Sequence, residues 1–167
     1  RNSDDFYART VLNSIIGGQF SSRINLNLRE DKGYTYGVNS NYSYNSLGST
    51  FTISTSIKTE NTIEAVKEIL FELENVKSTI TEEEITFSKS YLIRRYPSLF
   101  ETYSQVAANI SLLPIFNLQD DYFENYISNL NSVNLREVSK AANDAILLDE
   151  MVVIVLGNKS IIKDTLN

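Results

Sequence analysis

Arg29 and Tyr36 are the residues of this 167-residue chain whose types and spacing best fit catalytic chemistry. They lie seven positions apart, on either side of a charged turn that contains Gly33. A turn of this length can direct both side chains to one point. There a guanidinium and a phenol would hold a carbonyl oxygen or an oxyanion through hydrogen bonds. The same residues also fit a solvated charged turn beside a buried structural tyrosine.

Three other patterns carry a weaker chemical signal. Gly17–Ser22 precedes a predicted helix, whose N-terminus could bind an anion, but it also fits the end of one helix followed by the start of the next. The acidic runs Glu82–Glu84 and Asp120–Asp121 could ligate a metal or form an acid/base pair, yet carboxylates in a first turn also complement the helix dipole. Tyrosines recur at alternating positions within residues 34–44. They fit the face of a sheet, and an exposed row of them would indicate a partner or peptide surface.

The composition excludes several classes of function. The chain has no His and no Cys, so a thiolate or imidazole zinc site and a Ser-His or Cys-His catalytic pair are ruled out. Its net charge of −6 argues against a nucleic-acid or anionic-membrane surface. We see no signal-like segment and no apolar stretch near the length of a membrane span, so the localisation is unknown. The first residue is Arg1 rather than Met, and we therefore expect a piece of a longer precursor.

The elements that must position these residues can be read from periodicity. Helical spacing from Phe6 to Ile16 predicts a first helix ending at a glycine pair, and Phe20, Ile24 and Leu28 predict one apolar stripe on a second. Alternation over residues 34–44 and 51–57, around a turn with Gly48, predicts a long antiparallel hairpin.

Helices dominate the rest of the chain. Capping boxes are predicted at Asn61 with Glu64, at Thr81 with Glu84 and at Asn134 with Glu137. The apolar run 151–156 predicts a strand buried on both faces in the middle of a sheet. The fold class is therefore α+β, a single domain over residues 1–167 in two layers, with helices on one face of a mainly antiparallel sheet.

The segments 11–23 and 28–38, followed by 81–84 and 100–102, resemble the pitrilysin and mitochondrial-processing-peptidase family of zinc peptidases. The match in order and spacing extends over nearly the whole chain. In that family two homologous halves enclose a chamber, and one half binds zinc through an inverted His-x-x-Glu-His motif. The resemblance implies that this chain is the other, C-terminal-type half, in which Arg29 positions the peptide and Tyr36 donates to the tetrahedral intermediate. It also implies that the first strand of the domain lies before Arg1.

We therefore expect a non-catalytic domain of a zinc metalloendopeptidase, with no metal and no cofactor in this chain and with zinc on a homologous partner domain or subunit. Peptide is the expected substrate, and an isolated half could form a homodimer. The alternative is a degenerate scaffold, or a peptide- or partner-binding module of the same fold without proteolysis. An independent carboxylate–metal hydrolase is a third hypothesis.

Overall fold

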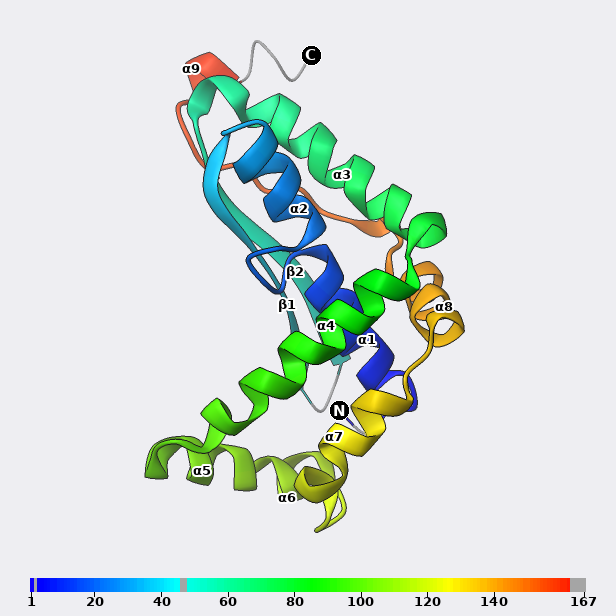
Figure 1. Ribbon diagram of the computed structural model, residues 1–167. Coiled ribbons are helices and arrows are strands. Elements are labelled where there is room, and N and C mark those ends of the chain that lie inside the picture. Colours follow the sequence, from blue (N-terminus) through cyan, green and yellow to red (C-terminus); the bar gives the residue numbers. More distant parts are fainter. Residues whose placement is uncertain (2, 46–47, 163–167) are drawn as a thin grey trace.

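A computed structural model describes residues 1, 3–45 and 48–162 of the chain. Helices pack against one face of a two-stranded antiparallel sheet, so the predicted α+β class is confirmed (Figure 1). The strands are β1 (Thr35–Asn45) and β2 (Gly48–Ile57). The α-helices are α1 (Phe6–Ile16), α2 (Arg23–Asn25), α3 (Thr62–Thr79), α4 (Glu82–Arg95), α5 (Tyr103–Ile110), α6 (Leu112–Phe116), α7 (Tyr122–Ser132), α8 (Leu135–Ala145) and α9 (Lys159–Ile162). A π-helix, η1 (Leu26–Asp31), and the 3₁₀ turns η2 (Thr59–Asn61), η3 (Tyr96–Phe100) and η4 (Leu148–Glu150) complete the elements.

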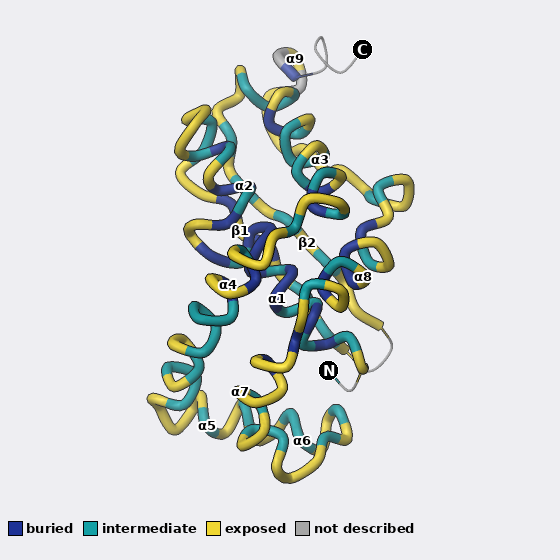
Figure 2. The backbone as a smooth tube through the Cα atoms, turned by 45° about the vertical axis from the view of Figure 1, so that its right-hand side comes forward, coloured by how far each residue is buried: buried dark blue, intermediate teal, exposed yellow. Residues whose placement is uncertain are grey.

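Helix α1 forms the centre of the molecule. It contacts α4, α7 and α8 on one side and β1 on the other. Val11, Leu12 and Ile16 on this helix are buried almost completely, and Figure 2 shows the buried backbone gathered where these elements meet. Burying a side chain of this size stabilises the fold by about 1.5–3 kcal/mol. The core therefore lies directly behind the strand that leads away from Tyr36.

The hairpin has one packed face and one open face. Its register runs from Val38 opposite Thr55 to Asn45 opposite Gly48, with an irregularity between Thr35 and Val38. Val38 and Ser40 are buried against the helices, and Phe51 and Ile53 are partly buried on the same face. The residues between them alternate outward and are exposed. This confirms the period of two that the sequence predicts.

The helix ends follow the sequence signals at two of the three predicted boxes. Reciprocal capping bonds are present at Thr81 with Glu84 and at Asn134 with Glu137. The prediction for Asn61 is wrong in detail, because it precedes α3 without a side-chain capping bond. Pro97 ends the long helix α4 in the turn η3, as expected for a residue without a backbone donor. Within the described residues, no helix combines the length and apolarity that crossing a bilayer requires.

The run Met151–Leu156 differs from its prediction. It carries no strand pairing in the described part of the chain, and it lies between α8 and α9 as an extended segment, orange in Figure 1. Val152 and Ile154 are 83% and 88% exposed, whereas Val153 and Val155 are less exposed. This alternation is the conformation of a strand without a neighbour, so the prediction of a buried central strand is wrong for these residues.

Candidate functional site: the turn between η1 and β1

A π-helical turn joins the helical layer to the hairpin. In η1 the N–H of Lys32 donates to the carbonyl of Asn27, 3.1 Å away, which is the five-residue spacing of a π-helix. Gly33 follows with φ of 62°, and the N–H of Tyr34 then donates to the carbonyl of Leu28 at 2.8 Å. Glycine adopts this left-handed conformation without the steric cost that a Cβ would add. The turn therefore reverses the chain between Arg29 and Tyr36.

Asn25 anchors the start of β1 to the helices. Its Nδ2 donates to the carbonyl of Val38 at 2.8 Å, and its Oδ1 accepts from the N–H of Val38 at the same distance. The same Nδ2 also reaches the carbonyl of Gln19 and the hydroxyl of Ser22. Asn25 is 3% exposed, so these bonds satisfy backbone groups that water cannot reach. They fix the position of the strand where it leaves the turn.

Arg29 is held by stacking. Its side chain is 17% exposed, and its guanidinium carbon lies 3.2 Å from the centroid of the Phe20 ring. One terminal nitrogen pairs with the carboxylate of Glu30. The Nε atom is buried and has no hydrogen-bond partner among the described residues. A guanidinium positioned in this way retains donors for a carboxylate or a carbonyl oxygen.

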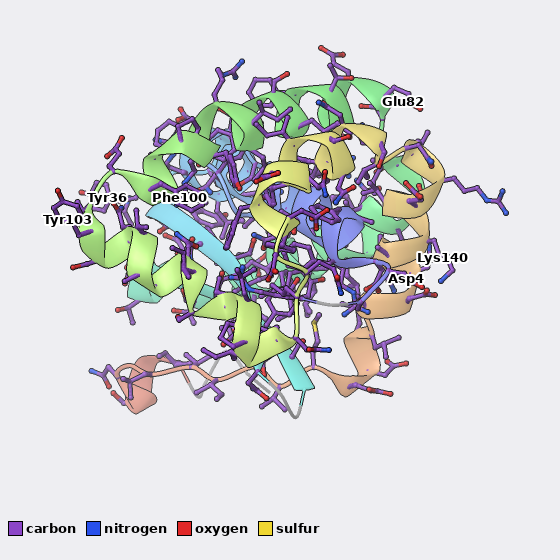
Figure 3. The ribbon with its side chains drawn as sticks, turned by 90° about the horizontal axis from the view of Figure 1, so that it is seen from below. Asp4, Tyr36, Glu82, Phe100, Tyr103 and Lys140 are labelled. Atoms are coloured by element: carbon purple, nitrogen blue, oxygen red, sulfur yellow. The ribbon has the colours of Figure 1, made fainter. Side chains whose placement is uncertain are left out.

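Tyr36 lies at the opposite extreme of exposure. Its side chain is 99% exposed at the irregularity that begins β1, and Figure 3 shows it on one side of the molecule. A side chain so exposed packs against none of the described residues, so the structure does not bring it into contact with Arg29. The two predicted site residues thus mark the two ends of one turn. One is fixed by its neighbours, and the other presents a phenol to whatever approaches.

The glycine pair at the end of α1 serves packing. The N–H groups of Gly17 and Gly18 both donate to the carbonyl of Asn13. A Cβ on Gly17 would lie 2.8 Å from the Oγ of Ser40, so the small residue permits β1 to approach the helix. Because both donors are already used within the chain, this segment does not offer them to an anion.

The acidic runs act at helix N-termini, and the described residues contain no cluster of three or more potential metal-ligating carboxylates. Glu84 closes the capping box with Thr81 and pairs with Arg23 at 2.6 Å. Burial alone would raise the pKa of Glu84, but the hydrogen bonds from Arg23 and from the backbone of Thr81 hold this pKa below its ordinary value. Together with the absence of His and Cys, this donor set does not fit a zinc site.

The roles of two residues in this region are not predicted from the sequence. Phe20 is predicted on a buried stripe with Ile24 and Leu28, but it lies in the turn before α2 and is 66% exposed beneath Arg29. Asn25 lies next to Ile24 of that stripe. A polar residue beside a buried position must form hydrogen bonds if it is buried too, and this is the signal from which its structural role could have been predicted.

Comparison with known proteins adds the family. Residues 1–92, more than half of the chain, match the peptidase M16 inactive domain. A peptidase M16 inactive domain from Pseudomonas fluorescens has a TM-score of 0.78 at 24% identity, over 90% of this chain and 36% of its own. A conserved protein from Enterococcus faecalis has a TM-score of 0.72 at 25% identity, over 84% of this chain and 33% of its own. An inactive peptidase domain from Bordetella parapertussis gives 0.73 at 16% identity, over 89% of this chain and 81% of its own.

This chain spans about a third of the length of the first two of these structures. A search of curated proteins gave no match. The sequence match and the fold agree with the resemblance seen in the sequence. The chain belongs to the peptidase M16 inactive-domain family, the non-catalytic domain of zinc proteases.

Proposed function

We propose that this domain closes the substrate chamber of a zinc metalloendopeptidase, opposite a homologous zinc-binding domain on the same or another chain. In this proposal Arg29 binds the peptide and Tyr36 donates a hydrogen bond to the oxygen that develops negative charge at the scissile bond. The observation that carries it is the free phenol of Tyr36, 99% exposed one turn after a stacked, largely buried arginine. A purely structural tyrosine would be packed against its neighbours.

The chemistry divides between the two domains. A zinc ion on the partner domain would lower the pKa of a bound water far below its ordinary value, to about 7, and would so supply the nucleophile. This domain supplies donors, and one donor to an oxyanion typically contributes about 3–4 kcal/mol, or 10²–10³ in rate. Its own residues cannot hold the metal, so the proposal assigns no turnover to the domain by itself.

A second candidate is a binding module that keeps the fold without proteolysis. The pairing of Arg29 with Glu30 and its stacking on Phe20 favour this reading, because both contacts hold the guanidinium against residues of this chain. Under this hypothesis Tyr36 contributes contact area to a bound partner and takes no part in a reaction.

Tyr36→Phe separates the two candidates, with Tyr103→Phe as a matched control. Tyr103 lies on α5 and is 97% exposed, so both substitutions remove one solvent-facing hydroxyl. In the full-length protein with its zinc-binding domain, we expect Tyr36→Phe to lower kcat about 100-fold with little change in KM. Tyr103→Phe should change neither constant. An unchanged kcat for Tyr36→Phe would favour the binding module.

We further propose that the domain is completed by a β-strand from outside residues 1–167, paired with Met151–Leu156. Two observations support this proposal. The run alternates in exposure as a strand does, and none of its N–H groups from Val152 to Leu156 has a backbone partner in the described part of the chain. An apolar strand with free backbone groups on both edges is a template for pairing.

A further inference from the structure

The hairpin lacks charge over an unusually long stretch. None of the 15 Lys and Arg residues or the 21 Asp and Glu residues falls within residues 33–57. The stretch begins after Lys32 and ends before Lys58, so the whole of β1 and β2 is neutral. Exposed sheet faces ordinarily carry charged side chains, which keep them soluble. A neutral exposed face therefore needs its own explanation.

The outward face of the hairpin is built from small hydrogen-bonding side chains. Opposite positions share a face of an antiparallel pair, and the pairs Asn39–Ser54 and Asn41–Thr52 both point outward. We call the exposed set the neutral face: Asn39, Asn41, Ser43, Thr50, Thr52, Ser54 and Ser56. None of these side chains forms a hydrogen bond within residues 1, 3–45 and 48–162, although the inward-facing Ser40 bonds to Asn13. Their whole hydrogen-bonding capacity is open to a partner.

These side chains suit a polypeptide of variable sequence. An amide or hydroxyl both donates and accepts, so it can bond to the N–H or the C=O of a peptide in either direction. Surfaces rich in Tyr, Ser, Gly and Asn adapt their hydrogen bonds to different partners in this way. Covering such groups costs much less free energy than covering an unpaired charge. The face therefore accepts a neutral partner readily and has no charge with which to select a charged one.

We propose that the neutral face binds an extended stretch of the substrate polypeptide and does not discriminate by its charge. This rests on the proposed function, because it makes the face part of the chamber wall that begins at Tyr36. A second protein domain or a second copy is a poorer occupant. The core of a stable protein interface is apolar and aromatic, and the neutral face contains no apolar side chain at its centre.

The test introduces one charge on the neutral face. Ser54→Lys and Ser54→Asp are compared with Ser78→Lys and Ser78→Asp, because Ser78 is an exposed serine on α3, outside the hairpin. The full-length protein, with its zinc-binding domain, is given three peptides of equal length that differ only in a neutral, cationic or anionic central stretch. The measurements are kcat/KM and, by fluorescence anisotropy, binding at low and high salt.

In the unaltered protein we expect the three peptides to differ less than about threefold, with little dependence on salt. At low salt, Ser54→Lys should weaken binding of the cationic peptide and strengthen binding of the anionic peptide, each by about threefold to tenfold. Ser54→Asp should have the opposite effect on both peptides. The Ser78 variants should leave the order unchanged. If Ser54→Lys lowers the folded fraction in circular dichroism, Thr52→Lys on the same face repeats the test.

Failure of this inference differs from failure of the proposed function. If peptide affinity changes with the charge introduced at position 54 but no peptide is cleaved, the inference is retained and the peptidase role is overturned. If the peptides are cleaved and the Ser54 and Ser78 variants show the same preference among them, the inference is overturned and the peptidase role is retained. An equal loss for all three peptides, together with a sedimentation coefficient lowered by opening or dissociation of the two domains, would assign the face to the domain interface and overturn the inference as well.

Discussion

The hairpin and the run Met151–Leu156 are both extended, yet their surroundings are opposite. In the hairpin one face packs on the helices, the other meets solvent, and each strand pairs with its neighbour. The run is apolar at every position and has neither a covering layer nor a pairing strand in the described part of the chain. Alternation in sequence matches a sheet with one open face, whereas a continuous apolar run requires partners on all sides.

The hairpin is held by contacts to the helices, whereas the run Met151–Leu156 is held at one end. The hairpin is fixed by bonds from the helical layer, among them those of Asn25 to Val38 and of Ser40 to Gly17. Among the described residues the run has no equivalent anchor beyond Met151, which packs at the edge of the core. A change at an anchor of the hairpin should therefore cost much more than a change in the run.

The largest expected effect comes from removing the anchor of β1. Asn25→Leu deletes the bonds to Val38 and leaves buried backbone groups unsatisfied, which should lower the free energy of unfolding by about 3 kcal/mol. Asn25→Asp keeps the acceptor for the Val38 N–H but places a buried carboxylate against the carbonyls of Val38 and Gln19, so at neutral pH it should cost at least as much. Urea unfolding followed by circular dichroism measures both. A loss below about 1 kcal/mol for Asn25→Leu would mean that packing alone fixes the hairpin.

The second prediction compares the two segments directly. Ile53→Thr in β2 should cost about 1–2 kcal/mol because Ile53 is partly buried against the core. Ile154→Thr in residues 1–167 should change the free energy of unfolding by less than about 0.5 kcal/mol, since that side chain is 88% exposed. In the longer protein we expect Ile154→Thr to cost as much as Ile53→Thr, because the proposed strand would cover it. Equal small effects in both lengths would contradict the added strand.

The sequence predicts what is local and repeated. The alternation of the hairpin and the capping boxes at Thr81 and Asn134 depend on neighbouring residues, and the structure confirms them. The continuous apolar sequence predicts the extended conformation of Met151–Leu156 but does not say what lies beside it. Phe20 leaves the predicted stripe because it lies in the turn before α2, and Arg29 stacks on it from the π-helix η1. For that reason Arg29 and Tyr36 could be selected from the sequence, but not the way in which each is held.

The smallest expected effect lies within the hairpin, at a group that packs without bonding. Burial raises the pKa of Tyr42 to about 12, and its hydroxyl is buried without a partner among the described residues. Tyr42→Phe removes an unsatisfied group, so at neutral pH it should change the free energy of unfolding by less than about 1 kcal/mol, in the stabilising direction.

The same variant should also differ from the unaltered protein in how its stability depends on pH. In the unfolded chain Tyr42 loses its proton near its ordinary pKa of 10.0, whereas the folded chain keeps this proton to about pH 12. Stability therefore falls as the pH rises from 10 towards 12, by on the order of 1–2 kcal/mol for this residue. Tyr42→Phe should lack this share of the loss, and its advantage over the unaltered protein should grow across that window. Ser43→Ala, which removes an outward hydroxyl of the neutral face, should keep the slope of the unaltered protein in urea unfolding at pH 7, 10 and 11. A parallel slope for Tyr42→Phe would instead mean that Tyr42 ionises in the folded state as readily as in the unfolded one, and that the packed face of the hairpin admits water.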